Sequence, residues 1–495
     1  MSYIGAIDQG TTSTRFMIFD QLGSVVAVAQ KEHTQFLPKA GWVEHDPLEI
    51  LRATDAVIKE ALASAGLVGS DLAAIGITNQ RETTVAWNAI TGVPLGNAIV
   101  WQDTRSQSIL DEISSELAET ITYKTGLPLA PYFSASKMSW MLRNSLTVQS
   151  VQDQQELRFG TIDSWLVWNL SDGNIHVTDV SNASRTLLMD LESLEWDEIL
   201  LKTFGIARSS LPSIKSSSEI YGYTSISGVF GARIPIAGIV GDQHAALLGQ
   251  LCFQKGESKT TYGTGNFALI NTGTEIIRSK KGLLTTLAFK LGEEPANYAL
   301  EGSVAVTGSA VQWLRDQLGI IENSAQIETL AASVSDNGGV YFVPAFSGLF
   351  APYWRSDARG VIVGLTRAAT KAHLARATLE AICYQTHDVI RAMEEELGTK
   401  IEILRVDGGI TQNRLCMQLQ ADILQKEISR PVVAETTALG AAYAAGLAVG
   451  FWKDKSDLMT QWRESHHWNP SVTAVQAENG LHNWQKAIER TLNWV

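Results

Sequence analysis

The chain has little that would mark a disulfide-rich, zinc-binding or nucleic-acid-binding protein. Its three cysteines are widely spaced and form no CxxC pair, so neither a disulfide framework nor a zinc cluster is indicated. Acidic residues outnumber basic ones by 52 to 39, which gives a net charge of −13 and argues against a nucleic-acid partner. The longest run of small apolar residues, 438–452, is shorter than the ~20 residues of a membrane span. We therefore expect no membrane span, and a buried helix at that position.

Several familiar signatures are also missing. The sequence has no GxxxxGK[ST] loop, no GxSxG elbow and no motif set of a protein kinase. A GxGxxA match at 263–268 runs into strand-like residues instead of a helix, which excludes a dinucleotide site there. The chain enters a strand without a basic and then apolar leader, so we expect a cytoplasmic protein.

Strand and helix patterns alternate along all 495 residues, which predicts an α/β protein of two or more domains. In the first half, strands are expected at 4–7, 15–20, 25–29 and 73–78, with a helix from Asp46-Pro47 to a stop at Gly66. In the second half, strands are expected at 259–262, 267–271 and 404–406, with a helix at 371–397. We interpret these halves as two related domains, 1–250 and 251–495.

The segment from Asp8 to Phe19 is the most informative in the chain. Two strand-length apolar runs flank a turn of glycine, hydroxyl side chains and Arg15, which predicts a β-hairpin with a donor-rich tip. Turn amides and hydroxyls of this kind suit phosphate oxygens, whereas Asp8 better suits a hydrated Mg²⁺. An ordinary Thr/Gly hairpin is the alternative for this segment alone.

Further polar turns follow predicted strands in both halves. Gly263–Gly265 and Asp407–Asn413 are glycine turns of the second half, and a nucleotide held between two domains needs such donors from both sides. Asp242 follows the apolar strand 236–240, where it could be a helix N-cap or a catalytic carboxylate, or both. Arg81-Glu82 could form a surface ion pair or hold two neighbouring hydroxyls.

With these segments in view, the sequence resembles the FGGY carbohydrate kinases of the actin-like ATPase superfamily over essentially its whole length. The resemblance implies two actin-like (ribonuclease H-like) domains with an active-site cleft between them, and ATP and Mg²⁺ as cofactors. The matching segments are 8–13, 41–47, 76–83, 98–105, 182–186, 241–246, 262–265, 344–349, 351–354 and 407–409. Asn79-Gln80-Arg81-Glu82 favours the members that phosphorylate glycerol.

The resemblance also implies a role for each matched residue. Asp242 would be the catalytic base, Asp8 would position the metal, and family members commonly form homodimers or homotetramers. The glycerol-binding positions would be Arg81, Glu82, Trp101, Tyr132, Asp242, Gln243 and Phe267. The nucleotide-binding positions would be Thr11, Thr12, Ser13, Arg15, Thr264, Gly308, Gln312, Gly409 and Asn413.

The sequence thus predicts an ATP-dependent kinase that converts glycerol to sn-glycerol 3-phosphate. A kinase for another small polyol or a ketose is the nearest alternative. A nucleotide-switched scaffold of the actin-like kind is the alternative from another class, although it would have no use for Arg81, Glu82 and Asp242 together.

Overall fold

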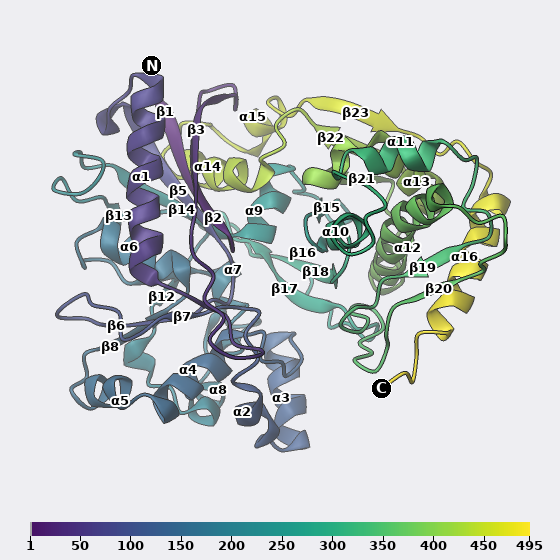
Figure 1. Ribbon diagram of the computed structural model, residues 1–495. Coiled ribbons are helices and arrows are strands. Elements are labelled where there is room, and N and C mark those ends of the chain that lie inside the picture. Colours follow the sequence, from purple (N-terminus) through teal and green to yellow (C-terminus); the bar gives the residue numbers. More distant parts are fainter. Residues whose placement is uncertain (1) are drawn as a thin grey trace.

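Two mixed β-sheets divide the chain into two lobes, as Figure 1 shows for the computed structural model, which describes residues 2–495. The first sheet has the order β13-β14-β5-β1-β2-β3, and the second has the order β17-β18-β16-β15-β21-β22-β23. The strands of the first sheet are β1 (Tyr3–Gln9), β2 (Ser13–Phe19), β3 (Val25–Glu32), β5 (Leu72–Asn79), β13 (Ser218–Tyr223) and β14 (Pro235–Gly241). Those of the second are β15 (Ser258–Tyr262), β16 (Asn266–Gly273), β17 (Leu284–Phe289), β18 (Asn297–Val304), β21 (Ile403–Asp407), β22 (Glu427–Pro431) and β23 (Glu464–Trp468).

The two sheets repeat one topology. In the first, the β1–β2 hairpin is antiparallel, β3 extends it on one side, and β5 and β14 run parallel to β1 on the other. In the second, β15 and β16 form the antiparallel hairpin, β18 extends it on one side, and β21 and β22 run parallel to β15 on the other. The outer strands β13 of the first sheet and β23 of the second are antiparallel to their neighbours. This shared order confirms the expected α/β fold of two related halves.

Local sequence signals account for the element boundaries. Helix α1 (Pro47–Ala65) begins at an N-cap, Asp46, whose carboxylate accepts a hydrogen bond from the Leu48 amide at 2.8 Å, and it ends at Gly66 with φ of 67°. Helix α12 (Lys371–Leu397) has the bounds that the sequence predicted. The predicted strands are confirmed as β1, β2, β3, β5, β15, β16 and β21, most of them one or two residues longer than expected.

The remaining elements extend the two lobes. Over residues 2–495, no helix is long and apolar enough to cross a membrane. The first lobe carries β4 (Glu44–His45), β6 (Val85–Asn88), β7 (Ala98–Ile99), α2 (Gln107–Asp111), α3 (Ser115–Thr125), α4 (Ser134–Asn144), α5 (Leu146–Asp153), β8 (Leu157–Gly160), α6 (Ile162–Leu170), β9 (Val177–Asp179), α7 (Val180–Ala183), β10 (Met189–Asp190), β11 (Glu195–Trp196), α8 (Glu198–Phe204), β12 (Ser213–Lys215) and α9 (Asp242–Gly249). The second carries α10 (Gly308–Asp316), α11 (Gln326–Ala332), β19 (Tyr341–Val343), β20 (Val361–Val363), α13 (Arg414–Leu424), α14 (Thr436–Ala448), α15 (Lys455–Met459) and α16 (Ala474–Glu489).

Helices α9 and α14 each pack against the sheet of the other half of the chain. Helix α9 follows the first sheet in the chain but packs on β15, β16 and β17, whereas α14 follows the second sheet and packs on β1, β5 and β14. In Figure 1, α14 accordingly lies beside the purple strands of the first lobe. The two helices touch at Gly440, where an added Cβ would lie 1.8 Å from the Ala245 carbonyl. The buried helix expected at 438–452 is therefore present but ends at Ala448, and Gly450 with φ of 70° follows it.

Candidate active site

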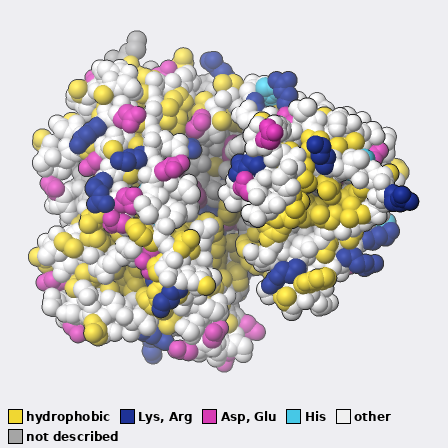
Figure 2. Space-filling view, viewed as in Figure 1, with side chains coloured by type: hydrophobic (Ala, Val, Ile, Leu, Met, Phe, Trp, Pro, Cys, Tyr) yellow, Lys and Arg dark blue, Asp and Glu magenta, His cyan; other side chains and the backbone are white. Residues whose placement is uncertain are grey.

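The surface of the molecule is hollowed between the two lobes (Figure 2). The β1–β2 hairpin bears the first group of predicted phosphate residues. At its tip, the Gly10 amide donates to the Ser13 carbonyl at 2.9 Å. Thr12 is exposed, whereas Thr11 is held from behind, because its hydroxyl accepts from Trp101 Nε1 at 2.9 Å and its carbonyl from Gln35 Nε2 at 2.8 Å. These contacts hold the tip in one conformation, with the Thr12 side chain exposed on it.

A buried hydrogen-bond network supports this tip. The Gly10 carbonyl accepts from Gln9 Nε2 at 2.8 Å and from Gln80 Nε2 at 3.2 Å. Gln80 also approaches His45 Nδ1 at 3.3 Å, and His45 Nε2 lies 2.8 Å from Gln35 Oε1. Burial lowers the pKa of His45 to about 3, so its ring stays neutral and can accept at Nδ1. Gln80 thus links the hairpin to Arg81 and Glu82, the two residues that follow Gln80 in the chain.

Arg81 lies at the centre of a buried charge network. Its Nε is 3.1 Å from Asp242 Oδ1, and its Nη1 and Nη2 lie 2.5 and 3.0 Å from the two carboxylate oxygens of Glu301 on β18. Gly241 makes room for it, since a Cβ there would lie 2.8 Å from Arg81 Cγ. Burial would raise the pKa of Glu301, but the charges of Arg185 and Arg81 hold it far below its usual range. Arg81 is therefore joined to both lobes.

Glu82 pairs with a different arginine. Its backbone has φ of 62°, and its Oε1 accepts from Arg185 Nε at 2.7 Å. Arg185 Nη2 reaches Glu301 Oε1 at 3.3 Å, so one carboxylate holds two guanidinium groups. The surface ion pair considered for Arg81-Glu82 is therefore wrong, because both side chains are buried and bind other residues.

Two of the three predicted aromatic walls lie together. Trp101 and Tyr132 make an edge-to-face contact with ring centroids 5.3 Å apart. Lys137 on α4 holds the Tyr132 backbone, since its Nζ donates to the carbonyl of Tyr132 at 2.7 Å and also to those of Pro131 and Phe133. Burial lowers the pKa of Lys137 to about 7. Phe267 comes from β16 of the other lobe.

Asp242 and Gln243 begin helix α9. The N-cap of this helix is Gly241, so the N-cap role considered for Asp242 is wrong by one residue. Asp242 Oδ1 accepts from the Gln243 amide at 2.7 Å. Gln243 Oε1 in turn accepts from Lys259 Nζ at 2.6 Å, and Lys259 is a fully buried residue of β15.

The other predicted nucleotide residues lie on turns and helix starts of the second lobe. The Gly308 amide donates to the Gly263 carbonyl at 3.1 Å, and the Ser309 amide to the Thr264 carbonyl at 3.1 Å, so the turn after β15 is joined to the start of α10. Gln312 is exposed one turn along this helix. The two segments therefore form one surface.

The turn after β21 stands beside that surface. Thr261 is in register with Asp407 across the parallel β15–β21 pair, so the turns after these strands leave the same edge of the sheet. A Cβ on Gly409 would meet nothing within 4 Å, which shows open space at this position. Asn413 is the N-cap of α13, with its side chain accepting from the Cys416 amide at 2.8 Å.

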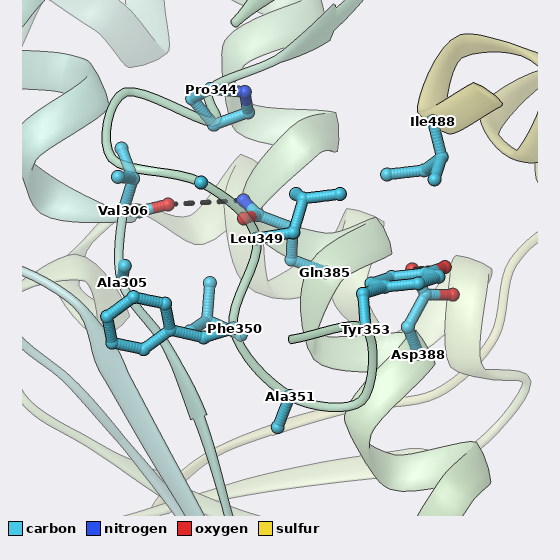
Figure 3. Close-up of a pocket in the computed structure, with 12 residues that line it drawn as sticks. Ala305, Val306, Pro344, Leu349, Phe350, Ala351, Tyr353, Gln385, Asp388 and Ile488 are labelled. Atoms are coloured by element: carbon cyan, nitrogen blue, oxygen red, sulfur yellow. Dashed lines mark hydrogen bonds between the residues drawn. The ribbon is translucent and has the colours of Figure 1, made fainter. Parts of the chain in front are cut away.

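A small pocket is lined by residues 304–306 at the end of β18, by the loop 344–353 and by α12 (Figure 3). Gln385 on α12 donates to the Val306 carbonyl at 3.1 Å, and the Tyr353 hydroxyl donates to Asp388 at 2.9 Å. Its lining, taken over residues 2–495, includes none of the predicted site residues. The pocket is therefore separate from the predicted site, and the Gln385–Val306 hydrogen bond joins α12 to the segment that precedes Thr307.

Asp8 has the surroundings that a divalent cation would need. Burial raises the pKa of Asp8 to about 6, Arg15 opposes this shift from 4.0 Å, and the negative charges of Asp242 and Glu435 add to it. Among the described residues, no three carboxylate, histidine or cysteine side chains form a closed metal cluster. One carboxylate, with waters and substrate phosphates, is how Mg²⁺ is commonly bound, so Asp8 fits that ion.

Two lobes of one topology, with glycine turns and a buried charge network between them, define a two-lobed α/β phosphotransferase architecture. The chain belongs to the FGGY family of carbohydrate kinases: residues 3–249 match the N-terminal domain of that family and residues 259–449 its C-terminal domain.

Individual relatives agree with this assignment. The chain is 60% identical to glycerol kinase 1 of Streptomyces coelicolor, across 100% of this chain and 98% of that protein, and 58% identical to the glycerol kinase of Mycobacterium tuberculosis, across 100% and 96%. The crystal structure of Plasmodium falciparum glycerol kinase with ADP superposes with a TM-score of 0.93 at 39% identity, covering 99% of this chain and 98% of that one. A xylulose kinase of Lactobacillus acidophilus, at 23% identity and a TM-score of 0.87 with 99% and 98% covered, shares the fold.

Four charged residues of the site were missed by the sequence analysis. Arg185 lies in the segment 182–186, which was noted without a role for its arginine. Glu301 and Lys259 interrupt strands of otherwise uncharged residues, which is a detectable signal, although it names no partner. Lys137 looks like an ordinary helix residue, and its partners become visible only in the structure.

Proposed function

We propose that this protein transfers the γ-phosphoryl group of ATP to glycerol, giving sn-glycerol 3-phosphate and ADP. The observation that carries the proposal is full-length identity of 58–60% to proteins named glycerol kinase. The first lobe would hold most of the polyol site and the second most of the nucleotide site, in line with the division into residues 1–250 and 251–495. A homodimer or homotetramer and a cytoplasmic location stay predictions.

The hydrogen-bonding groups that remain free suit a small polyol. Over residues 2–495, Glu82 Oε2 and Asp242 Oδ2 receive no hydrogen bond, whereas their partner oxygens are occupied. Three of the five N–H groups of Arg81 face Asp242 and Glu301, and Gln243, whose Oε1 is occupied by Lys259, has its Nε2 group left to donate. Two acceptors beside several donors match adjacent hydroxyls, each of which donates and accepts once.

The aromatic residues support a short substrate. Trp101 and Tyr132 from one lobe and Phe267 from the other would cover the CH groups of the polyol. Three large side chains leave room for about three carbons, and a buried donor or acceptor left unpaired by a missing hydroxyl costs about 1–3 kcal/mol.

Asp242 is the proposed catalytic residue. Its Oδ1 is held by Arg81 and by the Gln243 amide, which leaves Oδ2 to receive the substrate proton. The hydroxyl oxygen would bond to the γ-phosphorus while the bond to the β–γ bridging oxygen breaks and ADP leaves. The hydroxyl proton would pass to Asp242 late, as a loose transition state requires.

The phosphate groups would lie between turns of the two lobes. Thr11, Thr12, Ser13 and Arg15 would contact them from the first lobe and Thr264 from the second. Gly308, Gln312, Gly409 and Asn413 would line the nucleoside side. When bound, Mg²⁺ held by Asp8 would neutralise charge on the phosphates.

A substrate panel tests the proposal directly. ADP release would be followed with glycerol, 1,2-propanediol, xylitol, xylulose and gluconate, and we expect glycerol to lead in kcat/KM by at least about tenfold. Preference for a five-carbon substrate would mean a sugar kinase of the same family. Slow ATP hydrolysis with no phosphorylated product would favour a nucleotide-switched scaffold.

A further inference from the structure

Two buried charges of opposite sign stand in one row across the second sheet. Lys259 on β15 is in register with Leu269 on β16, and Leu269 is in register with Glu301 on β18. Residues in register across neighbouring strands project to the same face of a sheet. This face carries α9, the helix that the first lobe contributes, so both charges reach the residues at its start.

Glu301 sets the orientation of Arg81. A carboxylate that accepts from Nη1 and Nη2 of one guanidinium fixes the plane of that group, and the two distances here are 2.5 and 3.0 Å. Both side chains are about 2% exposed or less, so water does not compete for these hydrogen bonds. The plane of Arg81, and hence the direction of its free N–H groups, depends on a residue of the other lobe.

Lys259 sets the orientation of Gln243. Its Nζ donates to Gln243 Oε1 at 2.6 Å, and it also reaches Thr261 Oγ1 at 2.9 Å and the Phe267 carbonyl at 3.4 Å. An ammonium has three donors and no acceptor, so the amide must turn its oxygen to Lys259 and its NH₂ group away. Although burial lowers the pKa of Lys259 to about 8, the ammonium form still prevails at pH 7.

We propose that Lys259 and Glu301 are positioning residues that set the donor pattern of the polyol site, Glu301 through Arg81 and Lys259 through Gln243. The inference rests on the proposed function, in which Phe267 is the one predicted polyol residue that comes from the second lobe. It adds that the second lobe also fixes the hydrogen-bonding geometry of the polyol residues in the first lobe. Polyol affinity therefore depends on how the lobes are joined.

Glu301→Gln tests the first half of the proposal. The amide keeps the shape but loses the charge that holds Arg81, so KM for glycerol should rise about ten- to hundredfold, the effect of one charge-assisted hydrogen bond. KM for ATP should stay within about threefold of wild type, because no nucleotide residue is touched. Glu394→Gln is the matched control: it breaks the 2.5 Å ion pair with Lys426 in the same lobe and should alter neither KM.

Lys259→Met tests the second half through a double-mutant cycle with Gln243→Met. If Lys259 acts through Gln243, the double variant should have the glycerol KM of Gln243→Met alone, because the partner is already gone. Lys259→Met alone should raise that KM at least about fivefold, while Lys426→Met does not. Additive effects on KM would mean a general structural role and would overturn the proposal for Lys259.

Wild-type turnover of glycerol, measured first, separates this inference from the proposed function. No turnover contradicts the proposed function. Normal turnover with an unchanged glycerol KM in Glu301→Gln and Lys259→Met contradicts the inference alone. Each variant is accepted when its far-ultraviolet circular dichroism spectrum at the assay temperature and its ADP affinity match those of the wild type. If Glu301→Gln does not fold, Glu301→Asp, which keeps the charge but shortens the side chain, takes its place with the same expected direction.

Discussion

Five charged side chains alternate in sign along one set of ion pairs: Asp242, Arg81, Glu301, Arg185 and Glu82. Removing one partner of a buried pair leaves an uncompensated charge, which is more costly than the pair itself is stabilising. The network is therefore better explained by orientation of its two ends than by stability. Both ends, Asp242 and Glu82, keep a free oxygen where a polyol would bind.

Asp242→Asn should abolish most turnover while leaving the site intact. The amide oxygen can still accept from the Gln243 amide, but the side chain can no longer take a proton, so kcat should fall about 10²- to 10⁴-fold. ATP affinity, measured by calorimetry, should stay near wild type. Asp190→Asn, which removes an ion pair with Lys124 in the same lobe, should retain full activity. Turnover of Asp242→Asn within a few-fold of wild type would rule out the assigned role.

Acid should destabilise the protein through His45. Its folded pKa of about 3 lies below the unfolded value of 6.5, so the unfolded chain binds more protons below pH 6.5 and stability falls as pH falls. At pH 5 this one group removes up to about 2 kcal/mol. His45→Gln, whose amide can still donate to Gln35, should lose less stability between pH 7.5 and 5 in urea titrations. Equal losses in both proteins would show that His45 is not responsible.

Sequence patterns pointed to the residues that are proposed to touch substrates, but not to the residues that hold those side chains in place. Asp242, Arg81 and Gln243 lie in recognisable turns, because a turn after a buried strand has a local signature. Glu301 and Lys259 lie inside strands, and their partners are 220 and 16 residues away in the chain. A strand pattern shows which residues share a face, but it does not show which element from another lobe will cover that face.

At the scale of elements, the predicted helices and strands stand close to where the sequence placed them, whereas their packing differs from what order along the chain suggests. Helix α1 and helix α12 have clear caps or amphipathic faces, which are local properties. The packing of α9 and α14 against the sheet of the other half follows from close contacts between glycines and backbone that no periodicity reveals. At Gly76 on β5, a Cβ would lie 2.1 Å from the Ala441 carbonyl of α14.

Two glycine substitutions should separate packing from nucleotide binding. Gly440→Ala forces a methyl group against the Ala245 backbone, which should destabilise the protein by about 1–3 kcal/mol. Gly409→Ala meets open space and should leave the unfolding midpoint unchanged, but its methyl group would stand where the nucleotide is proposed to lie. Titrations should therefore show weaker ATP binding for Gly409→Ala with glycerol KM unchanged. Normal ATP affinity would place the nucleotide elsewhere.

At the scale of the whole molecule, several hydrophobic clusters contain residues from both halves of the chain. The face of the first sheet formed by Ile4, Ala6 and Met17 is covered by α14 from the second half of the chain. In return, Leu284 and Leu287 of β17 pack in a cluster of the first lobe, and the Tyr298 hydroxyl donates to the Leu191 carbonyl at 2.7 Å. The halves are related in topology, but each relies on residues of the other half to bury part of its apolar surface.

The fragment 1–250 should therefore not fold by itself. Without α14, the apolar face of β1, β5 and β14 would be open to water, and burying apolar surface is the main favourable term in folding. We expect the separately expressed fragment to aggregate or to bind a hydrophobic dye, and the full chain to unfold in one calorimetric transition. Adding residues 430–452 through a flexible linker should restore solubility, whereas a linker of equal length without them should not. A monomeric fragment with a native near-ultraviolet circular dichroism spectrum would show that the first lobe is independent of α14.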